Sequence, residues 1–252
     1  MSKQTVSIDI DGRSYSLETG RFAKFANGSV LARSGDTMVL VTVVAESEAK
    51  PEMDYMPLQV EYREKAASAG KIPGGFLRRE GGKPSDHEVI ISRLIDRPIR
   101  PMFPKTWRFD TQIIATVYSS DPEVDPDTIA AIGASAALMV SDIPYTGPIS
   151  EVRVGRINGE LVLNPSKVLL KDSDLDMTIA GTDTSIVMVE GESHEISEGD
   201  FLEVLEFAHS RIKLFNDLQK QLANLINPTK REFIEPEIPE EIKECVKNAI
   251  HT

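Results

Sequence analysis

Two arginines, an aromatic ring and two pairs of glycines occur together in the stretch GKIPGGFLRREGGKPSDHE, residues 70–88. The planar guanidinium groups of Arg78 and Arg79 suit phosphate oxygens, and the ring of Phe76 offers a stacking face for a base. Paired glycines let a backbone approach a ligand closely. The stretch therefore predicts a loop that holds a flexible polyanion without reading its bases. The alternative is a surface turn whose arginines pair with nearby acids.

The charge of the chain is unevenly distributed around this loop. The whole chain has a formal net charge of −12, which disfavours a general coat of nucleic acid because like charges repel. Residues 65–108, however, contain ten basic and four acidic side chains, about +6, which leaves about −18 for the remainder. A basic island in an acidic body indicates a local anion site. The alternative is a solvated surface with scattered arginines.

A helix is predicted directly after the loop. Ser85 and Glu88 have the spacing of a capping box, and Pro98 is expected to end the helix. Three arginines of this region are expected to line the path of the polyanion or to bind an anion near it: Arg93, Arg97 and Arg100. The alternative is an internal network of these arginines with Asp96.

The order of the predicted elements indicates an α+β fold with mostly antiparallel sheets. The first 60 residues alternate like strands, and the run TMVLVTVV is apolar enough to be expected buried on both faces. The pairs Asp11-Gly12 and Asn158-Gly159 have the composition of hairpin turns.

Two further helices and a tail follow the strands. Asp125 is expected as the N-cap of a helix with Pro126 at its first position. A long amphipathic helix is predicted over about Glu198–Ile226. Residues 227–252 open with a proline-rich linker and begin a new helix near Pro239, which is expected to continue in a longer protein.

Two segments resemble ligand-binding motifs but lack residues that the motifs require. The segment GGKPS has proline at position 84, where a nucleotide-binding P-loop needs serine or threonine, and proline also removes a backbone donor. The segment DSDLDM starts like a calcium loop, but Met177 and Asp183 stand where glycine and glutamate are required. We expect the second segment to begin a strand.

The composition indicates in which compartment the protein works and which kinds of site it lacks. Cys245 is the single cysteine, so an internal disulfide is excluded, and the four histidines show no metal-ligand spacing. The sequence contains no apolar run of about 18 residues and no apolar signal segment at its start. We expect a cytoplasmic protein with no membrane partner and no metal site in this segment.

A longer stretch is recognisable as a whole. EYREKAASAGKIPGGFLRREGGKPSDHEVIISRLIDRPIRPMF, residues 61–103, closely resembles the first RNase PH-like core of the polynucleotide phosphorylase (polyribonucleotide nucleotidyltransferase) family. KIPGG, the arginine pair, SRLIDRPIRP and the later IAGT occur in the order and spacing of that family, and the resemblance runs from about Val6 to the end. It implies an RNase PH-like α+β core (ribosomal protein S5 domain 2-like).

The resemblance also implies an activity. Members of that family are nucleotidyltransferases that degrade RNA from its 3′ end by phosphorolysis and release nucleoside diphosphates, in RNA processing and mRNA turnover. Phosphate is the co-substrate, and Mg²⁺ serves a second core of the full-length enzyme rather than this one. The implied partners are single-stranded RNA, the other chains of a homotrimeric ring, and RNA-degradation machinery such as an endoribonuclease or helicase.

The resemblance divides the chain and assigns its loop. Residues 1–226 would form the first core, and residues 227–252 a linker and the truncated start of an all-helical domain. The family's RNA-gripping loop falls on Phe76, Leu77, Arg78 and Arg79. Two aromatic residues are usual there, so Leu77 leaves one stacking face absent and shifts the grip toward the arginines.

The catalytic positions of the active second core fall here on a degenerate site. The phosphate-binding serine corresponds to Asp127, and a carboxylate would repel phosphate there. One metal-binding aspartate is kept as Asp176, the other corresponds to Leu170, and the catalytic lysine to Thr178. One carboxylate beside a leucine cannot build a metal site, so this core is expected to have no catalytic residues.

Three hypotheses follow for the function. The first is an RNA-guiding and trimer-forming core without catalysis of its own, within a phosphorolytic exoribonuclease. The second is a purely structural ring-forming subunit without direct RNA contact, which would not need a basic island. The third is a stand-alone phosphorylase.

Overall fold

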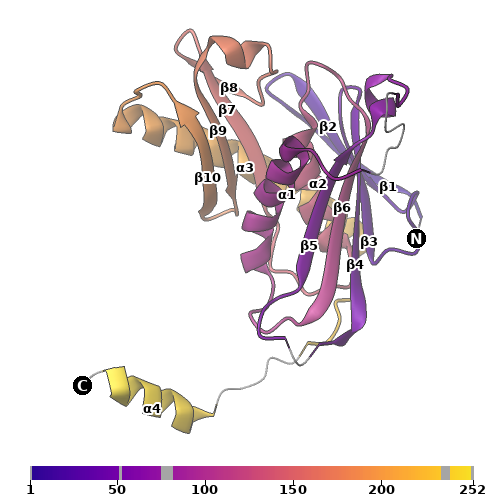
Figure 1. The fold of residues 1–252 in the computed structure, drawn as a ribbon, viewed down its shortest axis with the longest axis vertical. Helices are drawn as coiled ribbons and strands as arrows, with labels where there is room; N and C mark the ends of the chain where they lie inside the picture. Colours follow the sequence, from indigo (N-terminus) through magenta and orange to yellow (C-terminus); the bar gives the residue numbers. More distant parts are fainter. Residues whose placement is uncertain (1, 51–52, 75–81, 234–238, 251–252) are drawn as a thin grey trace.

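The computed structural model of the chain describes residues 2–50, 53–74, 82–233 and 239–250, which form two β-sheets and the helices between and around them (Figure 1). The strands are β1 (Gln4–Ile10), β2 (Arg13–Thr19), β3 (Gly28–Ser34), β4 (Thr37–Ala49), β5 (Leu58–Glu64), β6 (Phe109–Ser119), β7 (Ser150–Ile157), β8 (Glu160–Leu163), β9 (Ser173–Gly181) and β10 (Ile186–Ser193). The helices are α1 (Asp86–Ile99), α2 (Pro126–Val140), α3 (Glu198–Ile226) and α4 (Glu240–Ile250), with short 3₁₀ turns η1 (Ala66–Ala69), η2 (Arg100–Met102) and η3 (Leu169–Asp172).

The larger sheet has the order β1-β2-β3-β4-β6-β5. Its neighbouring strands are antiparallel, except that β5 and β6 run parallel. The first hairpin turns at Asp11 and Gly12, whose φ angles are 48° and 79°, as a two-residue hairpin turn requires. The predicted α+β fold with mostly antiparallel sheets is confirmed.

One strand prediction is wrong. In the TMVLVTVV run of β4, Val39, Val41 and Val43 are fully buried, whereas Val44 is 45% exposed and the alternate positions before it are half-buried. Helix α2 packs on β3 and β4 from one side only. The apolar residues of the other face therefore remain accessible in this chain.

The smaller sheet has the order β10-β9-β7-β8 and is antiparallel throughout. The predicted turn between β7 and β8 lies at Asn158 and Gly159, with φ angles of 53° and 85°. The amphipathic helix α3 covers one face of this sheet and buries Ala208, Ile212 and Phe215. Its bounds confirm the span predicted from the apolar spacing.

Helix α2 is the central element of the core. Every residue of it except Met139 is buried, and it contacts strands of both sheets as well as α3. A Cβ atom on Gly133 would lie 2.8 Å from Val41 Cγ2, so the helix approaches the larger sheet too closely for any side chain there. This packing fixes the position of both ends of α2.

Helix α1 starts as predicted and ends slightly later. The Ser85 hydroxyl accepts the Glu88 N–H at 3.2 Å, and the Glu88 carboxylate accepts the Ser85 N–H at 2.7 Å, which completes the capping box. Pro98 lies inside the helix rather than at its end. Regular helix continues to Ile99 and is followed by the 3₁₀ turn η2.

Polar side chains of this region close the free edge of β5. The Ser92 hydroxyl accepts the backbone N–H of Tyr62 at 2.9 Å. The guanidinium of Arg100 donates to the carbonyls of Met56 and Leu58, both at 3.1 Å. Unpaired edge strands invite unwanted pairing with other chains, and these contacts occupy edge groups that another strand would need.

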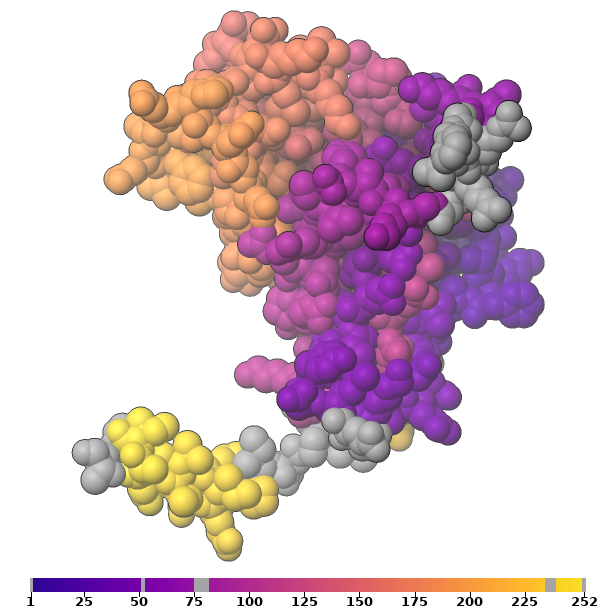
Figure 2. Space-filling model, viewed as in Figure 1, coloured from indigo at the N-terminus to yellow at the C-terminus, as the bar shows by residue number. Residues whose placement is uncertain are grey.

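The segment after α3 is anchored to the body. Lys230 donates to three carbonyl oxygens at the end of α2, Arg231 pairs with Asp142 at 2.9 Å, and the ring of Phe233 lies 5.5 Å from that of Trp107. Helix α4 has no buried residue and stands apart from the body (Figure 2). Within the described residues no helix has the length and apolar character to cross a membrane.

Candidate functional site

The N-terminus of α2 carries two carboxylates. Asp125 occupies the N-cap position, but its side chain makes no capping hydrogen bond within the described structure. Asp127, in the first turn, is 3% exposed and accepts the backbone N–H of Thr128 at 2.6 Å. Free N–H groups and the helix dipole favour anions at such an end. Here the protein's own carboxylates already occupy that position.

Arg153 on β7 holds these carboxylates together with a third one from β9. Its guanidinium lies 3.3 Å from Asp125 Oδ2, 3.2 Å from Asp127 Oδ2 and 2.8 Å from Asp176 Oδ1. Lys167 reaches Asp125 Oδ2 at 3.3 Å from the more exposed side. Two of the sequence-predicted positions, Asp127 and Asp176, are therefore joined through one cation.

The ionisation of this cluster is shifted from ordinary values. Burial, followed by the charge of Asp125, raises the pKa of Asp127 to about 6. Burial and the charge of Asp127 raise the pKa of Glu151, on the same strand as Arg153, to about 8. Burial disfavours the charge of Arg153, but its carboxylate partners outweigh that effect and raise its pKa. One oxygen each of Glu151 and Asp125 has no hydrogen-bond partner among the described residues.

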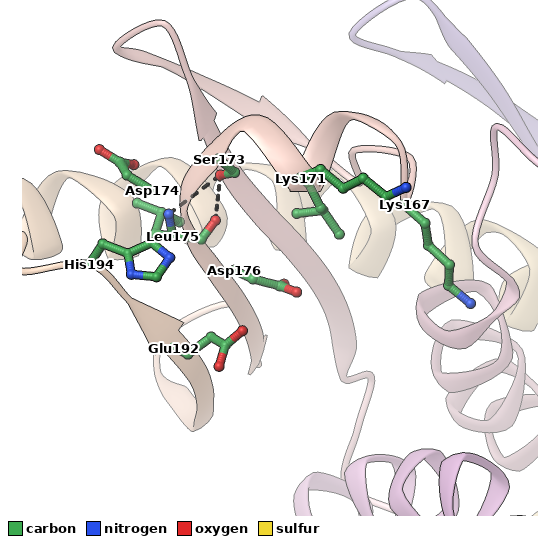
Figure 3. A pocket seen from close by; sticks show the side chains of 9 residues that line it. Lys167, Lys171, Ser173, Asp174, Leu175, Asp176, Glu192 and His194 are labelled. Carbon is green, nitrogen blue, oxygen red and sulfur yellow. Dashed lines mark hydrogen bonds between the residues drawn. The ribbon is translucent and has the colours of Figure 1, made fainter.

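A cavity of about 250 Å³ lies beside this cluster (Figure 3). It is bordered by the turn that carries Lys167, Leu170 and Lys171, and by Asp176 and Glu192 of the smaller sheet. Figure 3 shows the side chains of Asp174 and Asp176 pointing in different directions, and the pairing of β9 with β7 is irregular at this point, because the register shifts between Gly155 and Ile157. The cavity walls thus mix cations, carboxylates and leucine side chains.

The donor set does not fit a divalent metal. Mg²⁺ needs carboxylates that are free to bind it, but Asp176 is held by Arg153 and Leu170 offers no donor atom. Thr178, which the sequence resemblance places at the family's lysine, is 5% exposed and lies in register between Arg153 and Glu190. In the described part of the chain no group of three or more His, Cys, Asp or Glu side chains is arranged to hold a metal.

The three arginines of the α1 region have different environments. Arg100 is engaged internally, because it pairs with Asp96 at 2.9 Å and donates to the carbonyl of Leu58 in β5 and to that of Met56 just before it. Of the three arginines, Arg100 thus makes the contact with Asp96 that the alternative hypothesis named. Arg97 pairs with Glu190 of β10. Arg93 is exposed and borders a shallow cavity of about 410 Å³ along β5, and it has no ion pair within the described ranges.

The predicted RNA-gripping residues Phe76, Leu77, Arg78 and Arg79 lie outside the described residues. The chain enters this loop from the 3₁₀ turn η1, where Gly70 has a φ of 67°. It leaves the loop at the capping box of α1. The RNA role of these four residues stays a prediction.

Sequence reasoning missed three charged members of the cluster, which are Glu151, Arg153 and Lys167. One signal was available. The strand SEVRVGRI places Glu151 and Arg153 two residues apart, hence on one face, whereas Val152 and Val154 lie on the other. Two opposite charges on a buried face require partners, but the sequence does not reveal which carboxylates supply them.

Comparison with known proteins identifies the family. The profile of the 3′ exoribonuclease family, domain 1, matches residues 11–144, and that of domain 2 matches residues 147–211. The chain belongs to this RNase PH family. The resemblance noted in the sequence is confirmed, since polyribonucleotide nucleotidyltransferases are close relatives within it. That of Amoebophilus asiaticus is 52% identical over 91% of this chain, and that of Chlorobium phaeobacteroides is 50% identical over 96%.

This RNase PH chain spans about a third of the length of those relatives, 32% and 33% respectively. Among solved structures, Rrp46 from rice matches with a TM-score of 0.66 at 15% identity, over 83% of this chain and 94% of that one. At that identity the likeness shows the fold alone. It confirms the RNase PH-like fold expected from the sequence.

We predict that Arg153→Met destabilises the chain by about 3–5 kcal/mol, because three carboxylates lose their shared partner and two of them are buried. Urea unfolding measures the loss. The matched control is Arg33→Met, whose exposed pair with Asp36 should contribute little. A loss for Arg153→Met as small as that of the control would show that the cluster does not depend on this cation.

A second prediction concerns pH. The folded-state pKa of Glu151 is about 8, above its ordinary 4.5, because the folded protein disfavours the charged carboxylate. The stability that the neutral side chain contributes is therefore complete below about pH 4.5 and is lost as the pH rises toward 8. Glu151→Gln stays neutral. Its stability advantage over the wild type should grow by up to about 1.4 kcal/mol per pH unit in that window.

Thermal unfolding of both proteins at pH 5 and pH 8 measures this difference. Glu160→Gln, which removes an exposed carboxylate on β8, is the control and should follow the wild type at both pH values. Identical pH dependence of Glu151→Gln and the wild type would mean that Glu151 is charged in the folded protein.

Proposed function

We propose that this chain is the first RNase PH-like core of a polyribonucleotide nucleotidyltransferase. The full-length protein would degrade RNA from its 3′ end by phosphorolysis and release nucleoside diphosphates. The relatives that carry this name, at 52% and 50% identity, support the proposal. The two RNase PH domain matches, which lie in sequence along the chain, support it as well.

We further propose that this core does not catalyse the reaction. The observation that carries this proposal is the closure of the α2 N-terminus by Asp125, Asp127 and Arg153. A phosphate ion would meet buried carboxylates there, and Arg153, the cation that contacts both of them, is already shared with Asp176. Phosphate as co-substrate and Mg²⁺ would then be bound in another part of the full-length protein.

The role left for this core is to guide RNA and to hold a ring together. Phe76, Leu77, Arg78 and Arg79 would grip the strand, and Arg93 and Arg97 would contact its phosphates beyond the loop. Arg93 is exposed and Arg97 is half-exposed, which makes both accessible to a ligand. Arg100 would support this surface from within, because its donors are directed to β5 and Asp96.

The same proposal covers organisation and partners. Residues 1–226 would form the core domain, and residues 227–252 a linker and the first part of an all-helical domain. The absence of any buried residue in α4 agrees with a helix that packs on something outside this chain. The partners would be single-stranded RNA, two further copies in a homotrimer, and RNA-degradation machinery such as an endoribonuclease or helicase, in the cytoplasm.

A purely structural ring-forming subunit without RNA contact is the second candidate. The observation that favours it is that Arg97 and Arg100 already have carboxylate partners, Glu190 and Asp96. The exposed Arg93 and the basic balance of residues 65–108 favour the RNA-guiding role instead. Binding of RNA separates the two.

We predict that Arg78→Ala/Arg79→Ala weakens binding of a labelled single-stranded RNA 20-mer and flattens the slope of log affinity against log salt by about 1.4. Each lost phosphate contact contributes about 0.7 on a single strand. Fluorescence anisotropy over a salt series measures both quantities.

The control removes two positive charges elsewhere on the surface, as Lys243→Ala/Lys247→Ala on α4. It should leave the slope near that of the wild type. If the loop variant keeps the affinity and slope of the wild type, the RNA-guiding role is lost and the structural subunit remains.

A further inference from the structure

Helix α1 is packed against the smaller sheet at one small apolar contact. Leu94 of α1 is buried there against Ala180 of β9 and Met188 of β10. Arg97 lies nearly one turn after Leu94, and Glu190 lies two residues after Met188 on the same face of β10. The apolar contact therefore sets the guanidinium of Arg97 beside the carboxylate of Glu190, with which it pairs.

This ion pair is accessible to solvent. The Arg97 and Glu190 side chains are 50% and 49% exposed, and exposed pairs of this kind are only weakly stabilising. A phosphate group offers the same guanidinium the geometry that a carboxylate offers. Another anion can therefore replace Glu190 at little cost.

The face of the smaller sheet around Glu190 is acidic. The strand register aligns Glu190 with Thr178 and Arg153, and it aligns Glu192 with Asp176 in the next row of the same face. Arg153 is the cation of this face, but three carboxylates already surround it. Glu190 is thus a carboxylate whose partner is an arginine of the opposing helix rather than one of its own sheet.

We propose that Glu190 competes with RNA phosphate for Arg97 and so limits how tightly this core holds the strand. The inference rests on the RNA-guiding function proposed above. A strand that moves along a path needs contacts that form readily and also release. Glu190 supplies the anion that takes over Arg97 when a phosphate leaves, so the backbone advances without leaving an unpaired charge.

The test is Glu190→Gln in the 252-residue chain, with binding of a labelled single-stranded oligoadenylate 20-mer measured by fluorescence anisotropy at low salt. The affinity should increase about two- to fivefold, the range expected for release of an exposed ion pair. In an Arg97→Gln background the same substitution should have no further effect on affinity, because Glu190 and phosphate then have no guanidinium to compete for.

Glu192→Gln is the matched control. It removes the same formal charge from the same strand face, and Glu192 has no ion pair with Arg97 in the described structure. Its affinity should change less than twofold. An equal increase for Glu192→Gln and Glu190→Gln, or an increase by Glu190→Gln that persists with Arg97→Gln, would show a general charge effect and overturn the proposal.

Arg97→Gln alone separates this inference from the function on which it rests. If Arg97→Gln weakens RNA binding while Glu190→Gln changes nothing, Arg97 contacts RNA and the competition by Glu190 is wrong. If Arg97→Gln leaves affinity and salt dependence unchanged, neither the RNA contact of Arg97 nor the competition stands. Glu190→Ala, which removes the side chain's hydrogen-bonding group as well, should reproduce the gain seen with Gln.

Discussion

The guanidinium of Arg153 is the cation on which the candidate site depends. It joins two carboxylates at the start of α2 to one on β9, with all three contacts between 2.8 and 3.3 Å. Because α2 is buried between the sheets, this contact ties the helix N-terminus to the smaller sheet. The same contact holds two carboxylates at the helix end, where free N–H groups and the helix dipole would otherwise favour an outside anion.

The arginines of the α1 region differ in how far the fold itself uses their donors. Arg100 closes the edge of β5 and pairs with Asp96, so its donors are used inside the fold. Arg97 pairs with Glu190 where both side chains are half-exposed, and Arg93 is exposed. The net charge of a segment therefore overstates the number of cations that lack a partner within the fold.

Local patterns in the sequence predicted the elements well, because they depend on neighbouring residues. The capping box of α1 and the bounds of α3 are examples. Contacts across long separations were not predictable: Arg153 meets Asp125 28 residues away, and Arg100 meets Met56 44 residues away. Burial of β4 was overestimated, since apolar composition does not say whether a layer covers the second face. The positions Asp127 and Asp176 came from the family resemblance rather than from pattern.

Phosphorolysis by the chain itself is the most direct test of its proposed catalytic silence. The purified 252-residue chain is incubated with single-stranded RNA, inorganic phosphate and Mg²⁺, and released nucleoside diphosphates are measured by chromatography. The closed helix N-terminus predicts no release above that of a heat-inactivated sample. Release that requires phosphate and disappears in Asp176→Asn would contradict the account, because it would place the reaction at the carboxylates that Arg153 holds at the start of α2.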